Sequence, residues 1–470
     1  MMDYYTEKNL PKLNKIINKV NPNDTKTVEF HAICHRALNS FNICVLEALV
    51  HWQERNWFSR VWVVQEFSLA RKATFICGKK SIQAEELLLA RQILDLSVLP
   101  ALCEDWQAGR QVTLRALLNN PLQSFLTSRQ RRKALEVGHG TGDTLYRVLE
   151  TIYVGSSMKA TKPCDMIYGL LGLANDTDKL HLHPDYSIES RLDLIYTRTA
   201  KAIIAGGHVD LLGLSQHQHQ QSGLPSWVPD WRGELRHSFA WQAGRNSKAY
   251  FNLCKELKPE LVKCADEKIL GLMGFYVDKV EEVGQSWDRN NELNYLTQIK
   301  RMCLLSAAKD HKIYSAAVRQ SEAVWRVLVC DIEQTILYEL IRATSSFSVG
   351  YRSYLAELEF IDKAKTMTAK QYLKKKQEIE NQDPEAHHFR ARVIDVGHGR
   401  PFLSELGYLG MGPPFLRSGD IIVVFMGASV PYIIRPTSGQ SFQLVGECYC
   451  DGIMDGEITD IRNKQPFFVR

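Results

Sequence analysis

The C-terminal part of the chain holds the pattern that most restricts the fold. An apolar run from Ile421 to Met426 lies between Gly419 and Asp420 on one side and a turn-forming segment that starts at Gly427 on the other. An apolar run of this length between turn residues is typical of a buried strand. The longest apolar stretch of the chain falls short of the roughly 20 residues that a membrane-spanning helix needs. The sequence therefore predicts a small β-module at the C-terminus and no membrane span.

Upstream of this module, apolar residues recur with helical spacing. Ile43, Leu46 and Leu49 fall on one face of a helix, which predicts a partly buried helix within residues 40–70. The segment 60–70 is apolar almost all round, and this is typical of a helix that is buried on every side.

A second helical pattern follows Pro184. Ser187 is predicted to cap the start of this helix, and the helix is predicted to run to Ala205 and end at Gly206. Its predicted buried stripe consists of Leu192, Ile195, Tyr196, Thr199 and Ile203.

The chain as a whole is predicted to have an α+β fold, with a predominantly helical N-terminal two-thirds and a small C-terminal β-module. Residues 74–83 are expected to form a short hairpin. We expect four regions along the sequence: 1–96, a helical region at 97–245, a variable α/β region with a charged helix at 246–390, and the β-module at 391–470.

Charge and cysteine usage limit the classes of partner and the compartment. The chain has 58 basic and 53 acidic residues, and the net charge of +5 is too small to indicate nucleic acid or an anionic membrane. Its first residues, Met1 to Lys8, lack the apolar core of a secretion signal. Its 11 cysteines are an odd number without a Cys-x-x-Cys pair, which indicates reduced thiols. We therefore predict a cytoplasmic protein that binds no nucleic acid.

Two groups of residues could be taken for metal ligands. Cys448 and Cys450 would share one face of a strand, but two further ligands are not nearby, and small buried side chains are the favoured interpretation. His217 and His219 lie in a His/Gln tract that reads as a polar loop. No metal site and no cofactor are predicted.

Glycine-rich and basic segments also carry no nucleotide-binding prediction. The segments 138–142 and 397–399 lack the G-x-G-x-x-G spacing, and no Walker motif occurs in the chain. A basic cluster from Arg129 to Lys133 is interpreted as a solvated loop, with a nuclear signal as the alternative. A nucleophile elbow and an H-E-x-x-H motif are also absent from the sequence.

Three ordered strings resemble one family. The first is R-x-W-x-x-Q-E followed by C-G-x-x-I, the second is D-x-I-Y-G-L-L-G-L followed by P-D-Y-S and L-P-S-W-V-P-D-W, and the third covers the β-module. The residues that fill family positions are Arg60, Trp62, Gln65, Glu66, Cys77, Gly78, Ile82, Asp185, Tyr186, Trp227, Trp231, Gly419, Asp420, Arg435, Gly446, Glu447, Gly452, Gly456 and Glu457. By these motifs the chain resembles fungal heterokaryon incompatibility (HET) proteins. The resemblance implies nonself recognition and programmed cell death through protein–protein interaction, with an unknown incompatibility partner.

The family's opening motifs do not occur in this sequence. Neither Ser-Tyr-x-Trp-Gly nor Asp-x-x-Cys-Ile-Asn-Gln is present, so residues 1–96 are identified with only the C-terminal part of a HET domain. We interpret the chain as a truncated gene product or a degenerate, inactive member of the family.

Glu66 is the one carboxylate that suggests catalysis. If its helix is buried, the carboxylate is desolvated and its pKa rises. Resemblance of HET domains to Toll/interleukin-receptor-like domains implies NAD hydrolysis as an alternative function, with Glu66 as its candidate residue. A structural carboxylate, bonded to an arginine, a tryptophan N–H or a backbone amide, is the favoured interpretation. No catalytic residue is therefore predicted firmly.

The string from Leu224 to Trp231 predicts an extended segment. Pro225 and Pro229 fix their own φ angles and force the preceding residues toward extended conformations. The rings of Trp227 and Trp231 must then be buried or form a large apolar patch. We expect the segment to pack as a clasp across the helix at 187–205 and against the β-module.

Overall fold

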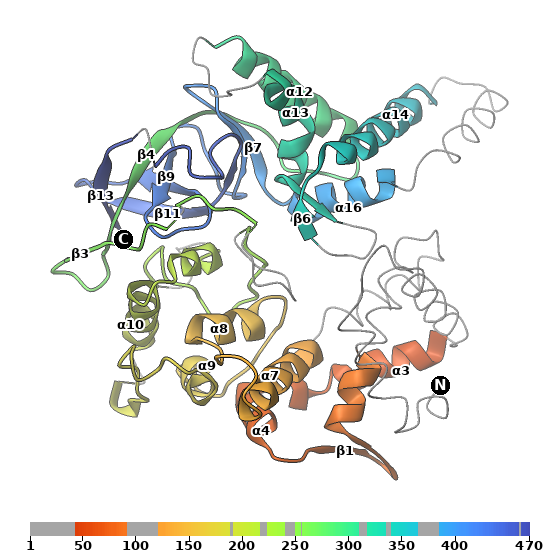
Figure 1. The fold of residues 1–470 in the computed structure, drawn as a ribbon, viewed down its shortest axis with the longest axis vertical. Coiled ribbons are helices and arrows are strands. Elements are labelled where there is room, and N and C mark those ends of the chain that lie inside the picture. Colours follow the sequence, from red (N-terminus) through yellow and green to blue (C-terminus); the bar gives the residue numbers. More distant parts are fainter. Residues whose placement is uncertain are drawn as a thin grey trace. The chain divides into compact units, whose positions relative to one another are not determined.

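The computed structural model gives an α+β fold that divides into two compact units (Figure 1). The first unit reaches Asp178 and the second starts at Lys179. The structure describes residues 43–91, 121–188, 191–216, 223–239, 250–254, 256–309, 317–334, 340–364, 385–459 and 462–470. The His/Gln tract at 217–221 and the charged segment around Lys374 lie outside these residues. In the described part of the chain, no helix combines the length and the apolar character that crossing a bilayer requires.

In its described residues, the first unit contains helices and a hairpin. Its elements are α3 (Ile43–Gln53), η2 (Asn56–Ser59), α4 (Val61–Leu69), β1 (Thr74–Cys77), β2 (Lys80–Gln83), α7 (Pro121–Glu136), α8 (Leu145–Tyr153), α9 (Asp165–Tyr168) and η3 (Leu171–Leu173). Residues 84–91 are also helical. The predicted hairpin is confirmed, and its turn contains Gly78 at a φ of +61°, where glycine is favoured.

An aromatic cluster forms the core between η2, α4, α7 and the hairpin. Phe58, Phe67 and Phe125 are buried, and the Phe58 and Phe125 rings meet edge to face with centroids 6.2 Å apart. Phe75 of β1 joins the cluster, with its ring centroid 5.5 Å from that of Phe67. This packing attaches the hairpin to the helices.

The basic cluster from Arg129 to Lys133 is not a solvated loop. It lies on α7, and the buried guanidinium of Arg129 donates to the carbonyls of Phe67 at 2.7 Å and Ala70 at 2.8 Å, where α4 ends. Its Nη2 also bonds Glu85 at 2.9 Å. The prediction for Arg129 was wrong because the carbonyls at a helix C-terminus need donors, and a distant arginine supplies them.

The second unit contains a closed β-barrel. Its sheet consists of β3 (Leu261–Val262), β4 (Leu270–Val283), β7 (Arg400–Ser404), β8 (Leu409–Gly412), β9 (Ile421–Phe425), β10 (Tyr432–Pro436), β11 (Phe442–Glu447), β12 (Tyr449–Cys450) and β13 (Lys464–Val469). The strands β4, β13, β11, β10 and β9 pair in this order, and β9 pairs back with β4. The predicted strand at Ile421 is therefore confirmed, and its buried side chains join the barrel core.

The barrel begins well before residue 391. The long strand β4 bonds β13 through residues 270–275 and β9 through residues 274–279. Its last residues, 280–283, bond β7 and so extend the sheet toward β8 and β12. The expected boundary at 391 falls inside a helix, because sequence order does not reveal that a distant strand completes the barrel.

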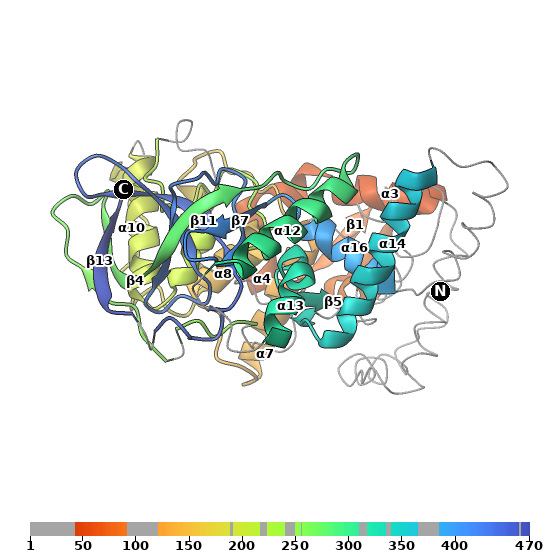
Figure 2. The same ribbon diagram turned by 90° about the horizontal axis from the view of Figure 1, so that it is seen from above.

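A mainly helical insertion separates β4 from β7. It contains α12 (Glu292–Ala307), α13 (Ala317–Arg326), η7 (Val327–Val329), β5 (Ile332–Gln334), β6 (Leu340–Arg342), η8 (Ser345–Phe347), α14 (Ser348–Ala364) and α16 (Glu385–Val396). Figures 1 and 2 show α12, α13, α14 and α16 gathered beside the strands, next to β7.

The predicted helix at 187–205 is shorter than expected. The structure has α10 (Leu192–Ala205) in this range, which ends at Gly206 as predicted, and η4 (Tyr186–Ile188) precedes it. Ser187 is not the N-cap, because its backbone N–H, at 2.9 Å, and its hydroxyl, at 2.5 Å, both bond Asp185. Of the predicted stripe, Ile195, Tyr196, Thr199 and Ile203 are buried and Leu192 is half-buried.

Candidate functional site

Two family strings meet in the first unit, where α4 packs on α9 and η3. Gly172 lies against Gln65, and a Cβ on Gly172 would lie 2.8 Å from Gln65 Nε2. Gly169 similarly lets the Trp62 ring approach, with 3.4 Å between Trp62 Cδ2 and the position of a Cβ. Arg60 precedes α4, and its neighbour Val61 bonds the Lys159 carbonyl at 3.1 Å. Gly169 and Gly172 of the second string therefore leave room for Trp62 and Gln65 of the first string.

Trp62 and Glu66 are not buried, contrary to expectation. Trp62 is 36% exposed and Glu66 is also exposed, whereas Val61, Val64 and Phe67 face the core. Residues four apart lie on the same face of a helix, so Trp62 and Glu66 share the exposed face of α4. Within the described residues, the Glu66 carboxylate has no hydrogen-bond partner. The argument from desolvation therefore no longer supports a catalytic or a structural role for Glu66.

The Leu224–Trp231 segment packs within the second unit as a clasp, but the prediction that it is extended was wrong, because Val228 donates its N–H to the Pro225 carbonyl at 3.1 Å and closes a turn. Trp227 and Trp231 are fully buried, and Trp227 Nε1 donates to the Lys268 carbonyl at 2.9 Å. The Trp231 ring meets Tyr196 of α10 edge to face, with centroids 4.9 Å apart. Leu444 of β11 donates its backbone N–H to the Ser226 hydroxyl at 2.9 Å. The expected contacts to α10 and to the barrel are thus both present.

Two family residues of the barrel form an ion pair in which Asp420 is buried and Arg435 is partly exposed. Arg435 on β10 bonds both carboxylate oxygens of Asp420, at 2.7 and 2.9 Å. Asp420 also accepts from the Arg417 N–H at 2.8 Å. The pair fixes the turn at Gly419 against the neighbouring strand, since Gly419 donates to the Val280 carbonyl of β4 at 2.9 Å.

The remaining family residues sit at turns and at a strand end. Glu447 accepts from the Phe239 N–H at 2.7 Å, and Glu457 accepts from the Asp455 N–H at 2.8 Å. Asp185 and Tyr186 lie exposed before α10. Among the family glycines, Gly78, Gly419, Gly452 and Gly456 have positive φ outside the strands, which supports their interpretation as turn residues. Gly446 also has positive φ but lies within β11, opposite Ile433 next to a register shift, so the interpretation as a turn residue was wrong for it.

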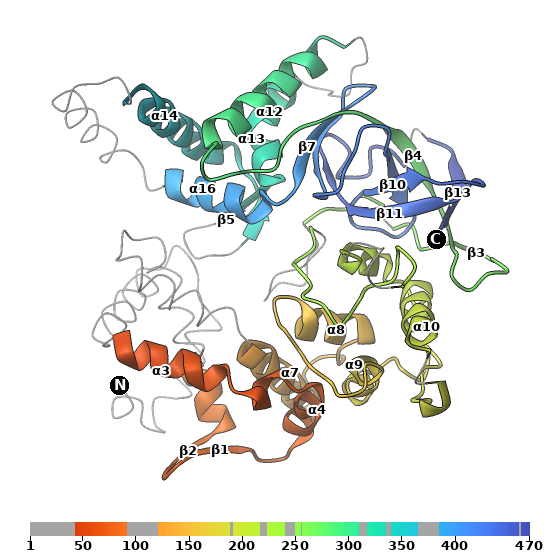
Figure 3. The same ribbon diagram turned by 180° about the vertical axis from the view of Figure 1, so that it is seen from behind.

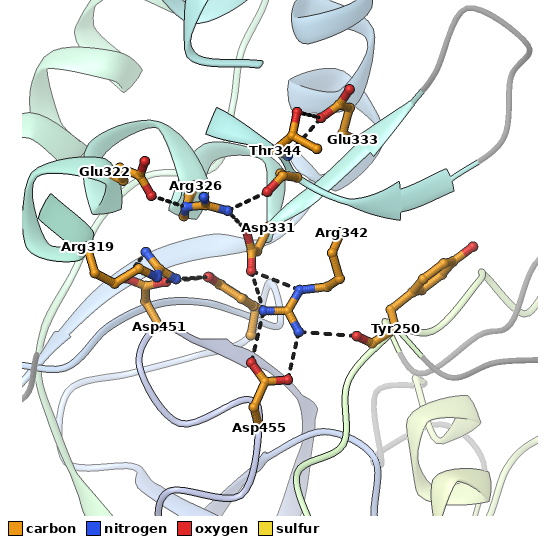
Figure 4. A network of polar contacts seen from close by, with 12 residues as sticks. Tyr250, Arg319, Glu322, Arg326, Asp331, Glu333, Arg342, Thr344, Asp451 and Asp455 are labelled. Carbon is orange, nitrogen blue, oxygen red and sulfur yellow. Dashed lines mark hydrogen bonds and ion pairs between the residues drawn. The ribbon is translucent and has the colours of Figure 1, made fainter. Parts of the chain in front are cut away.

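A network of charged side chains lies where the helical insertion meets the segment at 449–457 (Figure 4). We call this group the arginine–aspartate network. It consists of Arg319 and Arg326 on α13, Asp331 before β5, Arg342 at the end of β6, and Asp451 and Asp455 after β12.

Asp331 is at the centre of the network and is 1% exposed. Its carboxylate bonds Arg326 on one side, and Arg342 Nε at 3.0 Å and Nη2 at 2.6 Å on the other. Cys330 and Asp331 have φ values of +50° and +55°, a conformation that non-glycine residues adopt rarely. The left-handed backbone turns the Asp331 carboxylate toward the two arginines.

Arg342 joins the helical insertion to the segment at 449–457. Its two Nη atoms bond the Asp455 oxygens at 2.9 and 3.1 Å, and Nη1 also bonds the Tyr250 carbonyl at 3.1 Å. Its guanidinium lies over the Phe251 ring, 4.8 Å from the centroid.

Arg319 makes a second connection between the same elements. It bonds both oxygens of Asp451, which is 0% exposed, and the Tyr449 hydroxyl donates to the same carboxylate. Burial lowers the pKa of Arg319, but the charges of Asp451, Tyr449 and Asp331 and the hydrogen bond to Asp451 together outweigh burial, so the pKa is raised. Burial, followed by the Asp451 charge, raises the pKa of Tyr449 well above its usual range.

The ion pairs of this network act as a clamp that holds the helical insertion against the segment at 449–457. Each of its buried carboxylates accepts from at least one guanidinium, so a general base would first have to break an ion pair. Among the described residues, no group of three or more His, Cys, Asp or Glu side chains could hold a metal ion. Cys448 and Cys450 are buried in the barrel core, which confirms that they are packing residues.

Sequence reasoning missed the network. Asp451 and Asp455 lie inside the third family string, but they are not among the family positions identified from the sequence. The arginines lie in the variable region, where no motif marks them. A usable signal is Asp331 directly after the apolar run Val327 to Cys330, because a buried carboxylate requires a cation.

The fold and this clamp define a protein with a β-barrel into which a helical, ion-paired insertion is built. Residues 267–470 match the family model described as the Het-6 beta-barrel domain. The chain is also 29% identical over 474 residues to "Heterokaryon incompatibility protein 6, OR allele" of Neurospora crassa. This alignment covers 90% of the chain and 67% of the relative. Residues 267–470 thus resemble a Het-6 barrel, and the chain is similar to a HET-type protein over most of its length, whereas no solved structure matches it.

Proposed function

We propose that this chain acts in nonself recognition between fungal strains and triggers programmed cell death through protein–protein contacts. The observation that carries the proposal is the similarity to heterokaryon incompatibility protein 6, because it extends over 90% of the chain and includes both compact units. The arginine–aspartate network supports a binding role over turnover, since its carboxylates are engaged by arginines.

The test is expression of the chain from an inducible promoter in Neurospora crassa strains that differ at incompatibility loci. The expected result is death of hyphal compartments in some strains and normal growth in others, scored with a vital dye. The Arg319→Ala variant, which breaks a buried ion pair, should lose the effect, whereas Arg198→Ala, in an exposed pair with Glu267, should keep it.

Two results contradict the proposal. One is normal growth in every strain although the protein accumulates. The other is equal death in all strains, which would indicate general toxicity without recognition.

Cleavage of NAD is not part of the proposal. Glu66 is exposed on α4, and its carboxylate has no hydrogen-bond or ion-pair partner among the described residues, so we expect purified protein to release no nicotinamide from NAD. Release of nicotinamide that disappears in Glu66→Gln but persists in Glu47→Gln, another exposed glutamate, would show that the alternative enzyme function is correct.

A further inference from the structure

The hairpin formed by β1 and β2 is a two-stranded ribbon. Figures 1 and 3 show it extending away from α4. Each strand pairs only with the other among the described residues. A ribbon of this kind has two outer edges, and each edge can accept a further strand.

The register shows which backbone groups point to the edge of β1. The Ala84 N–H donates to the Ala73 carbonyl at 2.9 Å, so this is a hydrogen-bonded pair at the base of the ribbon. Bonded and non-bonded pairs alternate along an antiparallel ladder. The N–H and C=O groups of Thr74 and Ile76 therefore face outward, where no strand meets them within the described residues.

The other edge is partly occupied. Gln83 of β2 donates its outward N–H to the Glu86 carboxylate at 3.0 Å. The edge of β1 is therefore the open one.

The charge around this edge has a single sign. Arg71 and Lys72 precede β1, Lys79 and Lys80 follow it, and all four are exposed without an ion pair in the described part of the chain. No acidic residue occurs from position 70 to 84. Between the cations, Ile76 is 74% exposed.

We propose that the open edge of β1 binds an extended, acidic segment of a partner protein, which pairs as a third strand. The outward backbone groups of Thr74 and Ile76 are spaced to pair with the backbone of a further strand, which a lipid surface does not supply. A second copy of the hairpin would bring the same four cations and be repelled. This inference rests on the proposed function for its biological meaning, because it names the partner's chemistry.

The probe is a fluorescein-labelled hexapeptide of alternating glutamate and valine, titrated with the full chain and followed by anisotropy. A lysine–valine hexapeptide of the same length is the control for strand propensity. We expect the glutamate peptide to bind at least about tenfold more tightly, and to weaken about tenfold or more when ionic strength rises from low salt to about 1 M. Equal binding of the two peptides would overturn the proposal.

Two variants test charge and backbone separately. Lys79→Glu with Lys80→Glu should weaken binding at least tenfold, whereas the matched change at Lys258 and Lys263, exposed cations outside the hairpin, should leave it within twofold. Ile76→Pro removes an N–H that faces outward and so should abolish binding while circular dichroism stays unchanged. Unaltered binding by either hairpin variant would overturn the proposal.

Three further measurements complete the test. Binding to phosphatidylserine vesicles in place of the glutamate peptide would assign the hairpin to a membrane surface and overturn the proposal. Self-association in sedimentation velocity that Ile76→Pro abolishes would assign the edge to a second copy, with the same consequence. The cell-death assay uses no peptide, so the two proposals fail separately. Cell death without binding of the glutamate peptide would overturn this inference alone. Binding of the glutamate peptide without cell death would overturn the proposed function alone.

Discussion

Asp451 is a carboxylate without solvent exposure whose charge is balanced by Arg319. Replacing Arg319 by alanine would leave this charge buried and uncompensated, which costs about 3–5 kcal/mol of unfolding free energy. We expect this loss in chemical denaturation of Arg319→Ala.

The matched control at the residue scale is Arg198→Ala. Arg198 and Glu267 are both more than half exposed, with side-chain values of 53% and 56%, so water already screens their attraction. The control should lose about 0–1 kcal/mol. Equal losses in the two variants would show that the network does not act as a clamp.

At the scale of elements, the contact between α4 and the 165–173 segment depends on a glycine. A methyl group on Gly172 would lie 2.8 Å from Gln65 Nε2, the end of a flexible side chain that can move aside, so Gly172→Ala should destabilise by only about 1 kcal/mol. Shortening the opposing side chain should relieve the close contact, and the double variant Gln65→Ala with Gly172→Ala should be more stable than the sum of the single losses predicts. Additive losses in thermal unfolding would contradict this explanation.

The clasp formed by the 224–231 segment gives a second prediction at this scale. Trp227 is fully buried and bonded to the Lys268 carbonyl, so Trp227→Ala should lower the unfolding free energy by about 3–5 kcal/mol. Trp62→Ala, at a partly exposed ring, should lose only roughly 1 kcal/mol. An unchanged unfolding midpoint in Trp227→Ala, combined with loss of incompatibility in cells, would instead identify a recognition surface.

At the scale of the whole molecule, each unit has its own core. The aromatic cluster around Phe125 belongs to the first unit, and the barrel core around Val424 belongs to the second. We therefore expect two transitions in scanning calorimetry, because domains with separate cores commonly unfold as separate units. Gly172→Ala should lower one transition and Arg319→Ala the other. A single transition that both variants shift would refute separate unfolding.

Local patterns in the sequence were sufficient where neighbouring residues determine the structure. The strand at Ile421, the hairpin with its Gly78 turn, the end of α10 at Gly206 and the burial of Trp227 were all predicted. In each case the cause is short-range, since turn glycines, prolines and apolar periodicity act within a few residues.

Residues far apart in sequence decided what the patterns could not show. Position 129 reads as part of an exposed basic run, yet its guanidinium caps α4 from another helix. Glu66 reads as buried in an apolar helix, yet only one side of that helix meets the core.

The sequence by itself determined the α+β class, the main strands of the β-module and the resemblance to HET-type proteins. Only the tertiary structure decided that β4 closes the barrel and that Arg319 and Arg342 clamp the helical insertion to the segment at 449–457. The physical reason is that these strand pairs and ion pairs form between residues more than a hundred positions apart. Such contacts depend on where the chain returns in space, which local propensity does not specify.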